Sequence, residues 1–254
     1  LDNGIAPSSS QAGNIKDRYL QKELSWVDSK GCGKIVFNDR ADDVHISKVL
    51  ELVNVENIRS KKFKVVLDSV NGAGGPVTKR LLGELGCETA AVNDEPTGLF
   101  AHTPEPTKDN LTGLCDLVKE HSGDVGFAQD PDADRLAIID ENGFYIGEEY
   151  TLAMAAKYIL SKKPGKAAAN LSTSRMIDDI AAEKGCEVIR TAVGEANVAG
   201  AMVENDCVIG GEGNGGVIDL RVGPIRDSLL AICYVLDLMA ATGKSISELR
   251  KEIG

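Results

Sequence analysis

The stretch "KFKVVLDSVNGAGGPVTKRLLGELG", residues 62–86, decides the fold class of this chain. Its opening part, "KFKVVLDS", is an apolar, β-branched run of the kind found in strands buried in a parallel sheet. The glycine-rich turn "NGAGG" follows, and the rest of the stretch has the apolar spacing of a helix. Pro76 at the start of that helix and Gly86 at its end match the residue preferences of helix boundaries. The stretch therefore predicts a strand, a tight turn and a helix in direct succession.

The same alternation extends along the chain in both directions. Upstream, residues 42–58 carry apolar side chains at helical spacing. Downstream we expect two series, each of which ends in two strands joined by a loop. The first has strands at 87–93, 124–129 and 136–141 and a helix at 110–121. The second has strands at 166–172, 186–193, 207–211 and 215–220 and helices at 148–163, 174–185 and 195–206. Strands that alternate with helices indicate α/β layers with mostly parallel sheets.

This order of elements predicts the fold class. We expect an α/β protein with two consecutive three-layer α/β/α domains whose sheets are mixed and mostly parallel. The first domain is placed at residues 37–146 and the second at residues 147–254. Residues 1–36 are interpreted as a linker or the tail of a preceding domain, with loop-like residues 6–14 and a short helix in residues 15–27. Because the chain starts with leucine rather than methionine, we expect it to be a piece of a longer protein.

The composition argues against several classes of function. With 254 residues, of which 43% are hydrophobic and 26% charged, the chain has the composition of a globular protein. A formal charge of −11 argues against a nucleic-acid partner, because phosphates would be repelled. No apolar run approaches the ~20 residues that cross a membrane, and no secretory signal is present, so we expect no membrane partner. The six cysteines show no C-x-x-C spacing, which favours buried free thiols in a reducing, cytoplasmic location.

The acidic loop "QDPDADR", residues 129–135, brings together Asp130, Asp132, Asp134 and Arg135. Like charges this close raise one another's pKa, and a divalent cation among the oxygens is the simplest remedy. An EF-hand would need glycine where Arg135 stands. A phosphatase with a nucleophilic aspartate would continue with glycine and a hydroxyl residue at the positions of Asp134 and Arg135. A Mg²⁺ platform for phosphoryl transfer, with Arg135 on phosphate oxygens, fits better, and a solvated acidic turn is the remaining alternative.

Four stretches carry a resemblance to a known family. "DPDADR" resembles the metal-binding loop of the α-D-phosphohexomutases, the phosphoglucomutase and phosphomannomutase superfamily. "GGEGNGG", residues 210–216, resembles the sugar-binding loop of that superfamily. "TAVGEANV", residues 191–198, and "KVVLDSVNGAGG" resemble two further stretches in the same order. On this basis the chain is identified as a member of the superfamily. Residues 37–254 resemble the superfamily's central domains II and III, and residues 1–36 resemble the end of its first domain.

The resemblance implies an isomerase that works as an intramolecular phosphotransferase. In the superfamily, four domains surround one cleft, and a phosphoserine in the first domain gives its phosphoryl group to a hexose phosphate. The resulting bisphosphate turns around and returns the other phosphoryl group, which interconverts hexose 1-phosphate and 6-phosphate. The resemblance assigns Mg²⁺ binding to Asp130, Asp132 and Asp134, and it makes Arg135 a catalytic arginine beside the phosphate. It assigns substrate binding to Glu212, Asn214, Gly194 and Glu195.

This sequence departs from the superfamily's patterns in three respects. Pro131 and Ala133 stand where glycines are commoner in the metal-binding loop. Asn214 and Gly215 stand where many members have a serine–glycine–histidine pattern, so glucose, mannose and glucosamine phosphate all stay open as substrates. No T-A-S-H-N-P-like stretch, the usual place of the phosphoserine, occurs in the sequence. We therefore expect the N- and C-terminal domains of the same enzyme as partners, and an isolated chain that is inactive. The alternative is a non-catalytic protein that binds a sugar phosphate or a metal.

Two further expectations concern geometry. If both domains belong to one mutase, the two loops face a shared groove and lie about 10–20 Å apart across a cleft that can still close. None of the three histidines is expected to act as a nucleophile. His45 and His121 lie in helix-like segments and are expected at the surface, and His102 lies in a proline-bounded loop that is at most a neighbour of the site.

Overall fold

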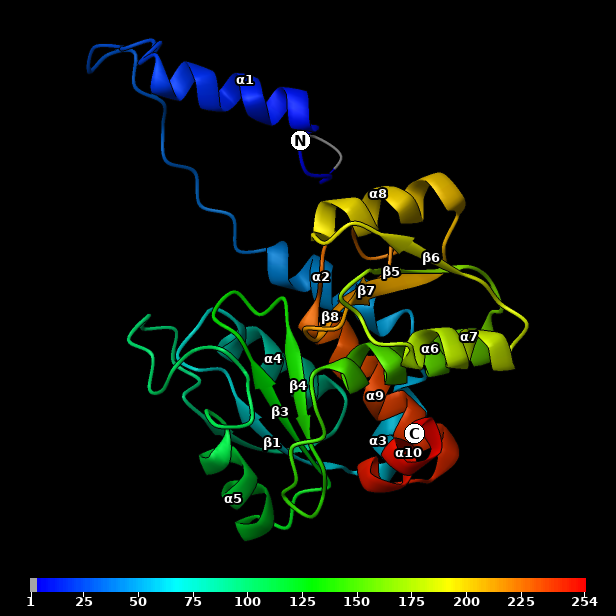
Figure 1. Cartoon of the computed structure of the whole chain (residues 1–254). Helices are drawn as coiled ribbons and strands as arrows, with labels where there is room; N and C mark the ends of the chain where they lie inside the picture. Colours follow the sequence, from blue (N-terminus) through cyan, green and yellow to red (C-terminus); the bar gives the residue numbers. More distant parts are fainter. Residues whose placement is uncertain (1–3) are drawn as a thin grey trace.

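The computed structural model describes residues 4–254 as two α/β units packed side by side, with an N-terminal arm that extends away from them (Figure 1). The arm consists of α1 (Ser9–Leu20) and residues 21–40, which form no helix or strand. The helix begins earlier than predicted because the Ser8 side chain accepts the N–H of Gln11 while the Gln11 side chain accepts the N–H of Ser8. The prediction of a loop is therefore wrong for residues 9–14 and holds for residues 6–8, and the helix predicted within residues 15–27 ends at Leu20. Residues 1–3 of the predicted linker lie outside the described residues.

The first unit contains a four-stranded mixed sheet in the order β2-β1-β3-β4. β1 (Lys64–Asp68) is parallel to β2 (Glu88–Val92) and β3 (Val125–Gln129), and β4 (Leu136–Ile139) is antiparallel to β3. The helices of this unit are α2 (Ala41–Leu50), α3 (Val55–Lys61), α4 (Gly74–Glu84) and α5 (Thr112–Glu120). Successive side chains of a strand point to opposite faces, so Val66 packs in the cluster of α5 whereas Val65 and Leu67 belong to the larger core on the other face.

The second unit repeats this topology, with strand order β6-β5-β7-β8 and the same two parallel pairings and one antiparallel pairing. Its strands are β5 (Ala167–Asn170), β6 (Val188–Thr191), β7 (Ile209–Glu212) and β8 (Gly216–Ile218). Its helices are α6 (Glu149–Lys162), α7 (Met176–Glu183), α8 (Glu195–Asn205), α9 (Ser228–Thr242) and α10 (Ile246–Ile253). The predicted fold class, two α/β/α domains with mixed and mostly parallel sheets, is confirmed.

Helix α9 joins the two units. Residues 228–240 are all buried, and the helix contacts α6 of its own unit and α2, α3 and β4 of the first unit. A buried polar group fixes this packing, because the carboxylate of Asp237 accepts the backbone N–H of Asn54 at 2.8 Å and also bonds to the hydroxyl of Tyr158 on α6. Helices α9 and α10 were not among the predicted elements: α9 has no polar face and so lacks an amphipathic pattern, whereas α10 begins with a capping box of Ser245 and Glu248 that the prediction did not include.

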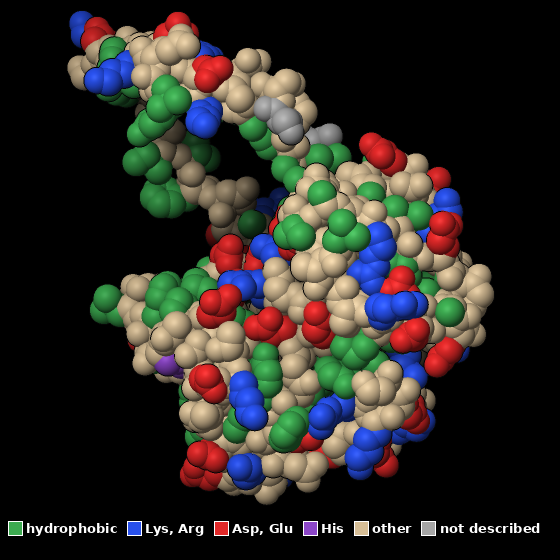
Figure 2. Space-filling view, viewed as in Figure 1, with side chains coloured by type: hydrophobic (Ala, Val, Ile, Leu, Met, Phe, Trp, Pro, Cys, Tyr) green, Lys and Arg blue, Asp and Glu red, His purple; other side chains and the backbone are tan. Residues whose placement is uncertain are grey.

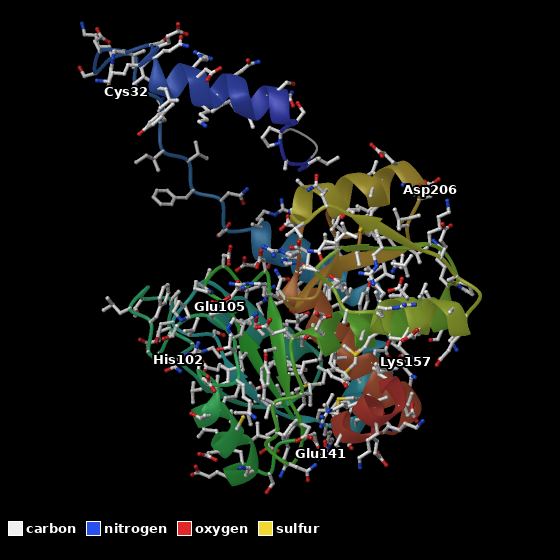
Figure 3. The ribbon with its side chains drawn as sticks, in the orientation of Figure 1. Cys32, His102, Glu105, Glu141, Lys157 and Asp206 are labelled. Atoms are coloured by element: carbon white, nitrogen blue, oxygen red, sulfur yellow. The ribbon has the colours of Figure 1, made fainter. Side chains whose placement is uncertain are left out.

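The expectations drawn from composition can be compared with the described residues. All six cysteines lie among them and are free thiols. Cys207 and Cys233 are buried as expected, but Cys32 is exposed on the N-terminal arm (Figure 3), so the expectation of burial is wrong for that thiol. Burial raises the pKa of Cys87 to about 12, which suppresses its thiolate form. Within residues 4–254 no helix alone has the length and apolar character needed to span a membrane, and α9 and α10 reach those limits only together, across a bend of 92°.

The glycine-rich turn between β1 and α4 lies directly against the acidic loop. The backbone N–H of Ala73 donates to the carbonyl oxygen of Pro131 at 2.8 Å. A Cβ on Gly72 would lie 2.4 Å from that same oxygen, and a Cβ on Gly75 would lie 2.1 Å from the carbonyl oxygen of Asp94. Both distances are far below van der Waals contact, so these two positions need glycine for the close approach of two backbone segments.

We predict that Gly72→Ala lowers the free energy of unfolding by about 1–3 kcal/mol, because the new methyl group collides with the backbone of the acidic loop. Gly83→Ala in α4 is the matched control, since a Cβ there meets no described atom within 4 Å. Alanine is the better helix former, so this control should gain about 0.5–1 kcal/mol. Urea unfolding followed by circular dichroism measures both variants, and equal stabilities would contradict the argument from close approach.

Candidate active site

The acidic loop joins β3 to β4 and is organised by its first carboxylate. Asp130 is 2% exposed, and its Oδ1 accepts the backbone N–H groups of Asp134 (3.1 Å) and Arg135 (3.0 Å). Its Oδ2 accepts Nε of Arg135 at 2.7 Å. Ala133 adopts a left-handed backbone conformation, with φ 59°, and Asp132 is exposed beside it. The loop thus closes around Asp130 and leaves Asp132 accessible.

The three aspartates of this loop converge. One oxygen each of Asp130, Asp132 and Asp134 lies within 4.8 Å of the other two. Burial, together with the charge of Asp130, raises the pKa of Asp134 to about 7, and the nearby Arg226 opposes that shift. The Oδ1 atom of Asp134 is buried and has no hydrogen-bond partner among the described residues. This oxygen lies 3.8 Å from Nε of Arg135 but accepts no hydrogen bond from the described residues, and such a buried carboxylate oxygen next to two further carboxylates fits the oxygen ligands of a hard divalent cation.

The second loop joins β7 to β8, and Glu212 lies at the end of β7. Glu212 is 4% exposed, and its Oε1 accepts hydrogen bonds from Nδ2 of Asn170 (2.6 Å) and from the backbone N–H of Gly194 (3.1 Å). Its Oε2 accepts Nη1 of Arg226 at 2.8 Å. Gly194 directly precedes α8, so this carboxylate connects the end of β7 with the turn before that helix. Glu212 is therefore held in one orientation by three donors.

The two loops meet directly. The N–H of Leu136 donates to the carbonyl oxygen of Gly215 at 3.1 Å, and Arg135 pairs with Gly216 in an antiparallel bridge. Asn214 is half-buried in the same turn, where its Oδ1 accepts the N–H of Gly216 at 3.3 Å. The two loops thus meet at one junction, but the expected separation of about 10–20 Å is wrong. The loops touch because β4 and β8 are edge strands of the two sheets and their ends lie against each other.

Arg226 lies between the two loops and was not among the residues expected from the sequence. Its Nη2 contacts Oδ2 of Asp134 at 2.5 Å, its Nη1 contacts Oε2 of Glu212 at 2.8 Å, and its Nε contacts Oε2 of Glu195 at 2.9 Å. Glu195, the first residue of α8, thereby joins the site. A signal for this arginine exists in the charge balance, because the site residues predicted from the sequence include five carboxylates and only Arg135 to neutralise them. Nothing in the sequence says which arginine supplies the missing charge.

A groove of about 530 Å³ opens beside this guanidinium at the junction of the two units. Its walls include Asp132, Asp134, Glu195 and Arg226, and His45 of α2 also lines it. Glu212 is not part of these walls, because it lies behind Arg226. Figure 2 shows acidic and basic side chains gathered along the junction, below the open space under the N-terminal arm. The groove therefore exposes Asp132, Asp134 and Glu195 to solvent, whereas Arg226 covers the carboxylate of Glu212.

His102 and Glu105 lie together on a loop of the first unit (Figure 3). Nε2 of His102 contacts Oδ2 of Asp68 at 3.0 Å, and its Nδ1 lies 2.9 Å from the carbonyl oxygen of Thr103. Glu105 reaches Nη1 of Arg135 at 3.4 Å. His102 therefore contacts residues outside the groove, whereas Glu105 of the same loop contacts the acidic loop.

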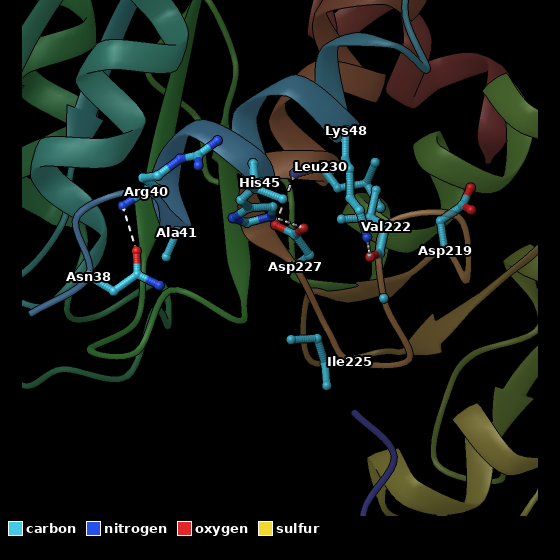
Figure 4. A pocket seen from close by; sticks show the side chains of 12 residues that line it. Asn38, Arg40, Ala41, His45, Lys48, Asp219, Val222, Ile225, Asp227 and Leu230 are labelled. Carbon is cyan, nitrogen blue, oxygen red and sulfur yellow. Dashed lines mark hydrogen bonds and ion pairs between the residues drawn. The ribbon is translucent and has the colours of Figure 1, made fainter. Parts of the chain in front are cut away.

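His45 is not the plain surface residue that the sequence indicates. Its Nε2 lies 2.6 Å from Oδ2 of Asp227, in a cavity of about 650 Å³ next to the groove (Figure 4). Asp227 caps α9, because its Oδ1 accepts the N–H groups of Leu229 and Leu230. Since Asp227 follows Arg226 in the chain, this pair anchors the backbone next to the guanidinium. The expectation for His121, which is exposed after α5, is met.

The fold and the site define a two-unit α/β/α protein in which a loop with three aspartates meets a second acidic loop at the junction of the units, beside a groove lined by Asp132, Asp134 and Glu195. The family model described as "Phosphoglucomutase/phosphomannomutase, alpha/beta/alpha domain II" matches residues 43–143, and that of domain III matches residues 147–253. The chain belongs to the phosphoglucomutase/phosphomannomutase family, and the resemblance noted in its sequence is confirmed.

Individual relatives agree with this assignment. A protein named "Phosphoglucomutase/phosphomannomutase" from Thermococcus kodakarensis is 41% identical, over 99% of this chain and 55% of its own length. One named "Probable phosphoglucosamine mutase" from Methanopyrus kandleri is 36% identical, over 98% of this chain and 55% of its own length. The crystal structure of a phosphoglucomutase/phosphomannomutase family protein from Burkholderia thailandensis matches with a TM-score of 0.85 at 25% identity, over 99% of this chain and 54% of that one. The chain thus spans about half the length of the relatives it matches.

We predict that the stability of the chain falls as the pH rises above neutrality, and that His45→Gln removes much of this fall. The hydrogen bond to Asp227 raises the pKa of His45 above its ordinary value of 6.5, assisted by Asp42 and opposed by burial and Lys48. Protonated His45 therefore stabilises the fold fully below pH 6.5, and this contribution is lost as the pH rises through the raised pKa. Because the side chain is 36% exposed, solvent limits the effect to roughly 0.5–1 kcal/mol.

Urea unfolding at a series of pH values between 5.5 and 9, a range chosen around the ordinary histidine pKa of ~6.5, measures this contribution. His121→Gln, which replaces the exposed histidine after α5, is the control and should keep the slope of the unmodified chain. Identical slopes for His45→Gln and the unmodified chain would show that the pair with Asp227 contributes no pH-dependent stability.

Proposed function

We propose that this chain is the metal- and sugar-binding part of a phosphohexomutase, which interconverts hexose 1-phosphate and 6-phosphate through a bisphosphate intermediate. The observation that carries this proposal is the convergence of the two loops, which share a backbone hydrogen bond and the guanidinium of Arg226. Membership of the family supports it. The relatives are named as mutases of glucose, mannose or glucosamine phosphates, which supports a hexose phosphate as the substrate class.

In this proposal Asp130, Asp132 and Asp134 hold Mg²⁺, a cation that takes oxygen ligands and leaves positions for phosphate or water. When bound, Mg²⁺ supplies positive charge against the phosphoryl group in transfer, a reaction that depends on charge neutralisation and positioning. Arg135 adds a second positive charge at the same loop. Because Asp130 fixes the Nε edge of Arg135, the Nη atoms are held in a defined direction, as bidentate contact with a phosphate requires.

The sugar would be bound on the other side of Arg226, by Glu212 with Asn214, Gly194 and Glu195. An ionised carboxylate accepts about four hydrogen bonds, and the protein supplies three to Glu212. One acceptor position is therefore left for a sugar hydroxyl.

We predict that Asp132→Asn weakens Mg²⁺ binding to this chain by roughly tenfold or more, because it removes a charged oxygen ligand. Asp132 is the cleanest of the three positions to change, since it is exposed and makes no hydrogen bond or ion pair within the described part of the chain. Asp116→Asn, at an exposed aspartate of α5, is the matched control and should bind Mg²⁺ like the unmodified chain. Titration calorimetry gives the affinities, and unchanged binding in Asp132→Asn would remove the acidic loop from the metal site.

We also predict that the 254-residue chain alone does not interconvert glucose, mannose or glucosamine 1- and 6-phosphates in the presence of Mg²⁺. The sequence contains no match to the stretch that carries the family's phosphoserine, and charge stabilisation does not replace a group that accepts and donates the phosphoryl group. Phosphorus NMR follows both phosphates directly, and sustained turnover by the purified chain would contradict the prediction.

The product of the complete reading frame tests the proposed function itself. It should interconvert at least one of these hexose phosphates, and Asp132→Asn should reduce its turnover while Asp116→Asn leaves turnover unchanged. A complete product that binds hexose phosphates and Mg²⁺ but transfers no phosphoryl group would instead support the alternative, a non-catalytic binding protein.

A further inference from the structure

A single guanidinium holds carboxylates that come from three separate elements. Its three nitrogens bond to Asp134 in the acidic loop, to Glu195 at the start of α8 and to Glu212 at the end of β7. Asp134 belongs to the proposed metal site, whereas Glu195 and Glu212 belong to the proposed sugar site. Arg226 therefore contacts both sides of the groove, and each contact is within hydrogen-bond distance.

The fold fixes Arg226 in this central position. The next residue, Asp227, caps α9 and is bonded to His45, and Ser228 donates its hydroxyl to the carbonyl oxygen of Ala133 at 2.6 Å. A Cβ on Gly216 would lie 2.2 Å from Cδ of Arg226, so a larger residue in β8 would displace the arginine side chain. A lysine carries its three N–H donors on a single nitrogen and does not reproduce contacts that three separate nitrogens of a planar guanidinium make. The backbone and the side chain are thus both arranged for an arginine at this position.

Asp134 can serve a cation and Arg226 at the same time. Its Oδ2 is bonded to Nη2 of Arg226, whereas its Oδ1 is buried without a hydrogen-bond partner among the described residues. A cation on Oδ1 would fix the orientation of this carboxylate, and with it one corner of the guanidinium. Because the other two nitrogens are bonded to Glu195 and Glu212, the restraint passes to the sugar side of the groove.

We propose that Arg226 is a positioning residue that couples cation binding at the aspartate loop to the placement of Glu195 and Glu212, so that Mg²⁺ and sugar phosphate bind cooperatively. The proposal rests on the proposed function, since it uses its metal site and its sugar site. Such coupling is reciprocal: the factor by which Mg²⁺ raises the affinity for the sugar phosphate equals the factor by which the sugar phosphate raises the affinity for Mg²⁺.

The test uses amide NMR spectra of this chain during titration with Mg²⁺. In the unmodified chain, Mg²⁺ should shift the amides of residues 132–135 and also the amide of Gly194, which donates to Glu212. In Arg226→Met the loop amides should still shift, but the Gly194 amide should not. Arg226→Lys keeps the charge and should also lose the response of Gly194. Arg221→Met is the matched control, because Arg221 lies in the same connection and pairs with Asp219 outside the groove.

A second measurement gives the coupling itself. Glucose 6-phosphate is titrated into each variant with Mg²⁺ at saturation and with EDTA. In the unmodified chain and in Arg221→Met, Mg²⁺ should raise the affinity roughly fivefold or more. In Arg226→Met and Arg226→Lys the ratio of the two affinities should fall to about one, whatever the affinities themselves are. Loss of the positive charge of Arg226 lowers the affinity for the phosphate both with and without Mg²⁺, so it leaves the ratio of the two affinities unchanged. A change in this ratio therefore reports the coupling alone.

The outcomes distinguish the two proposals. A Gly194 amide that responds to Mg²⁺ in Arg226→Met as it does in the unmodified chain would overturn the role of Arg226 and leave the metal site in place, because the restraint would then pass through the backbone contact of Leu136 with Gly215. Loop amides that do not respond to Mg²⁺ even in the unmodified chain would overturn the metal site of the proposed function, and the coupling with it. Should Arg226→Met fail to fold, Arg226→Lys decides the question by the same criteria.

Discussion

Five carboxylates in one small region can coexist only if cations reach them, and this requirement shapes the rest of the site. Unpaired charges in partly buried positions are costly, and a salt bridge offsets that cost only with good geometry. Arg135 serves Asp130 from within the acidic loop, whereas Arg226 serves Asp134, Glu195 and Glu212, which come from three elements. The guanidinium can reach all three only if the loop before β4, the end of β7 and the start of α8 meet. The junction of the two sheets is therefore an electrostatic requirement as well as a consequence of hydrophobic packing.

The position of this guanidinium depends in turn on α9, which lies mostly far from the groove. Arg226 directly precedes the cap of α9, and the first residue of the helix, Ser228, accepts a hydrogen bond from Nε2 of Gln129 at 2.7 Å at the end of β3. The body of α9 is buried between the two units and is tied to the first unit by the bond between Asp237 and Asn54. A substitution that loosens α9 would therefore move Arg226 relative to both loops. In this fold, the packing of the core therefore also determines the geometry of the site.

The local features of the chain could be predicted from the sequence, and the long-range ones could not. Strands and helices follow from periodicity and boundary residues, and the two loops follow from their motifs, because both depend on neighbours in the chain. The start of α1 was missed because the capping box at Ser8 was not recognised. Helix α9 was missed because a helix buried on all sides has no amphipathic period. The contacts of Arg226 with Asp134 and of His45 with Asp227 could not be predicted for another reason. The first joins residues 92 positions apart and the second residues 182 positions apart, and no local pattern in the sequence indicates such contacts.

The acidic loop keeps its shape without the glycines that are commoner in its family. A left-handed conformation at Ala133 costs roughly 1–2 kcal/mol compared with a right-handed one. Its own N–H donates to the carbonyl oxygen of Asp130 at 3.1 Å, and its carbonyl oxygen accepts the N–H (3.2 Å) and the hydroxyl (2.6 Å) of Ser228, so three hydrogen bonds oppose that cost. The loop is thus held by contacts within residues 4–254 and does not need a ligand to order it. Since ordering a loop on binding lowers affinity, a loop ordered in advance favours the capture of a cation and a phosphosugar. The cation and the phosphosugar of the proposed function would therefore meet a loop whose shape is already set by the chain's own contacts.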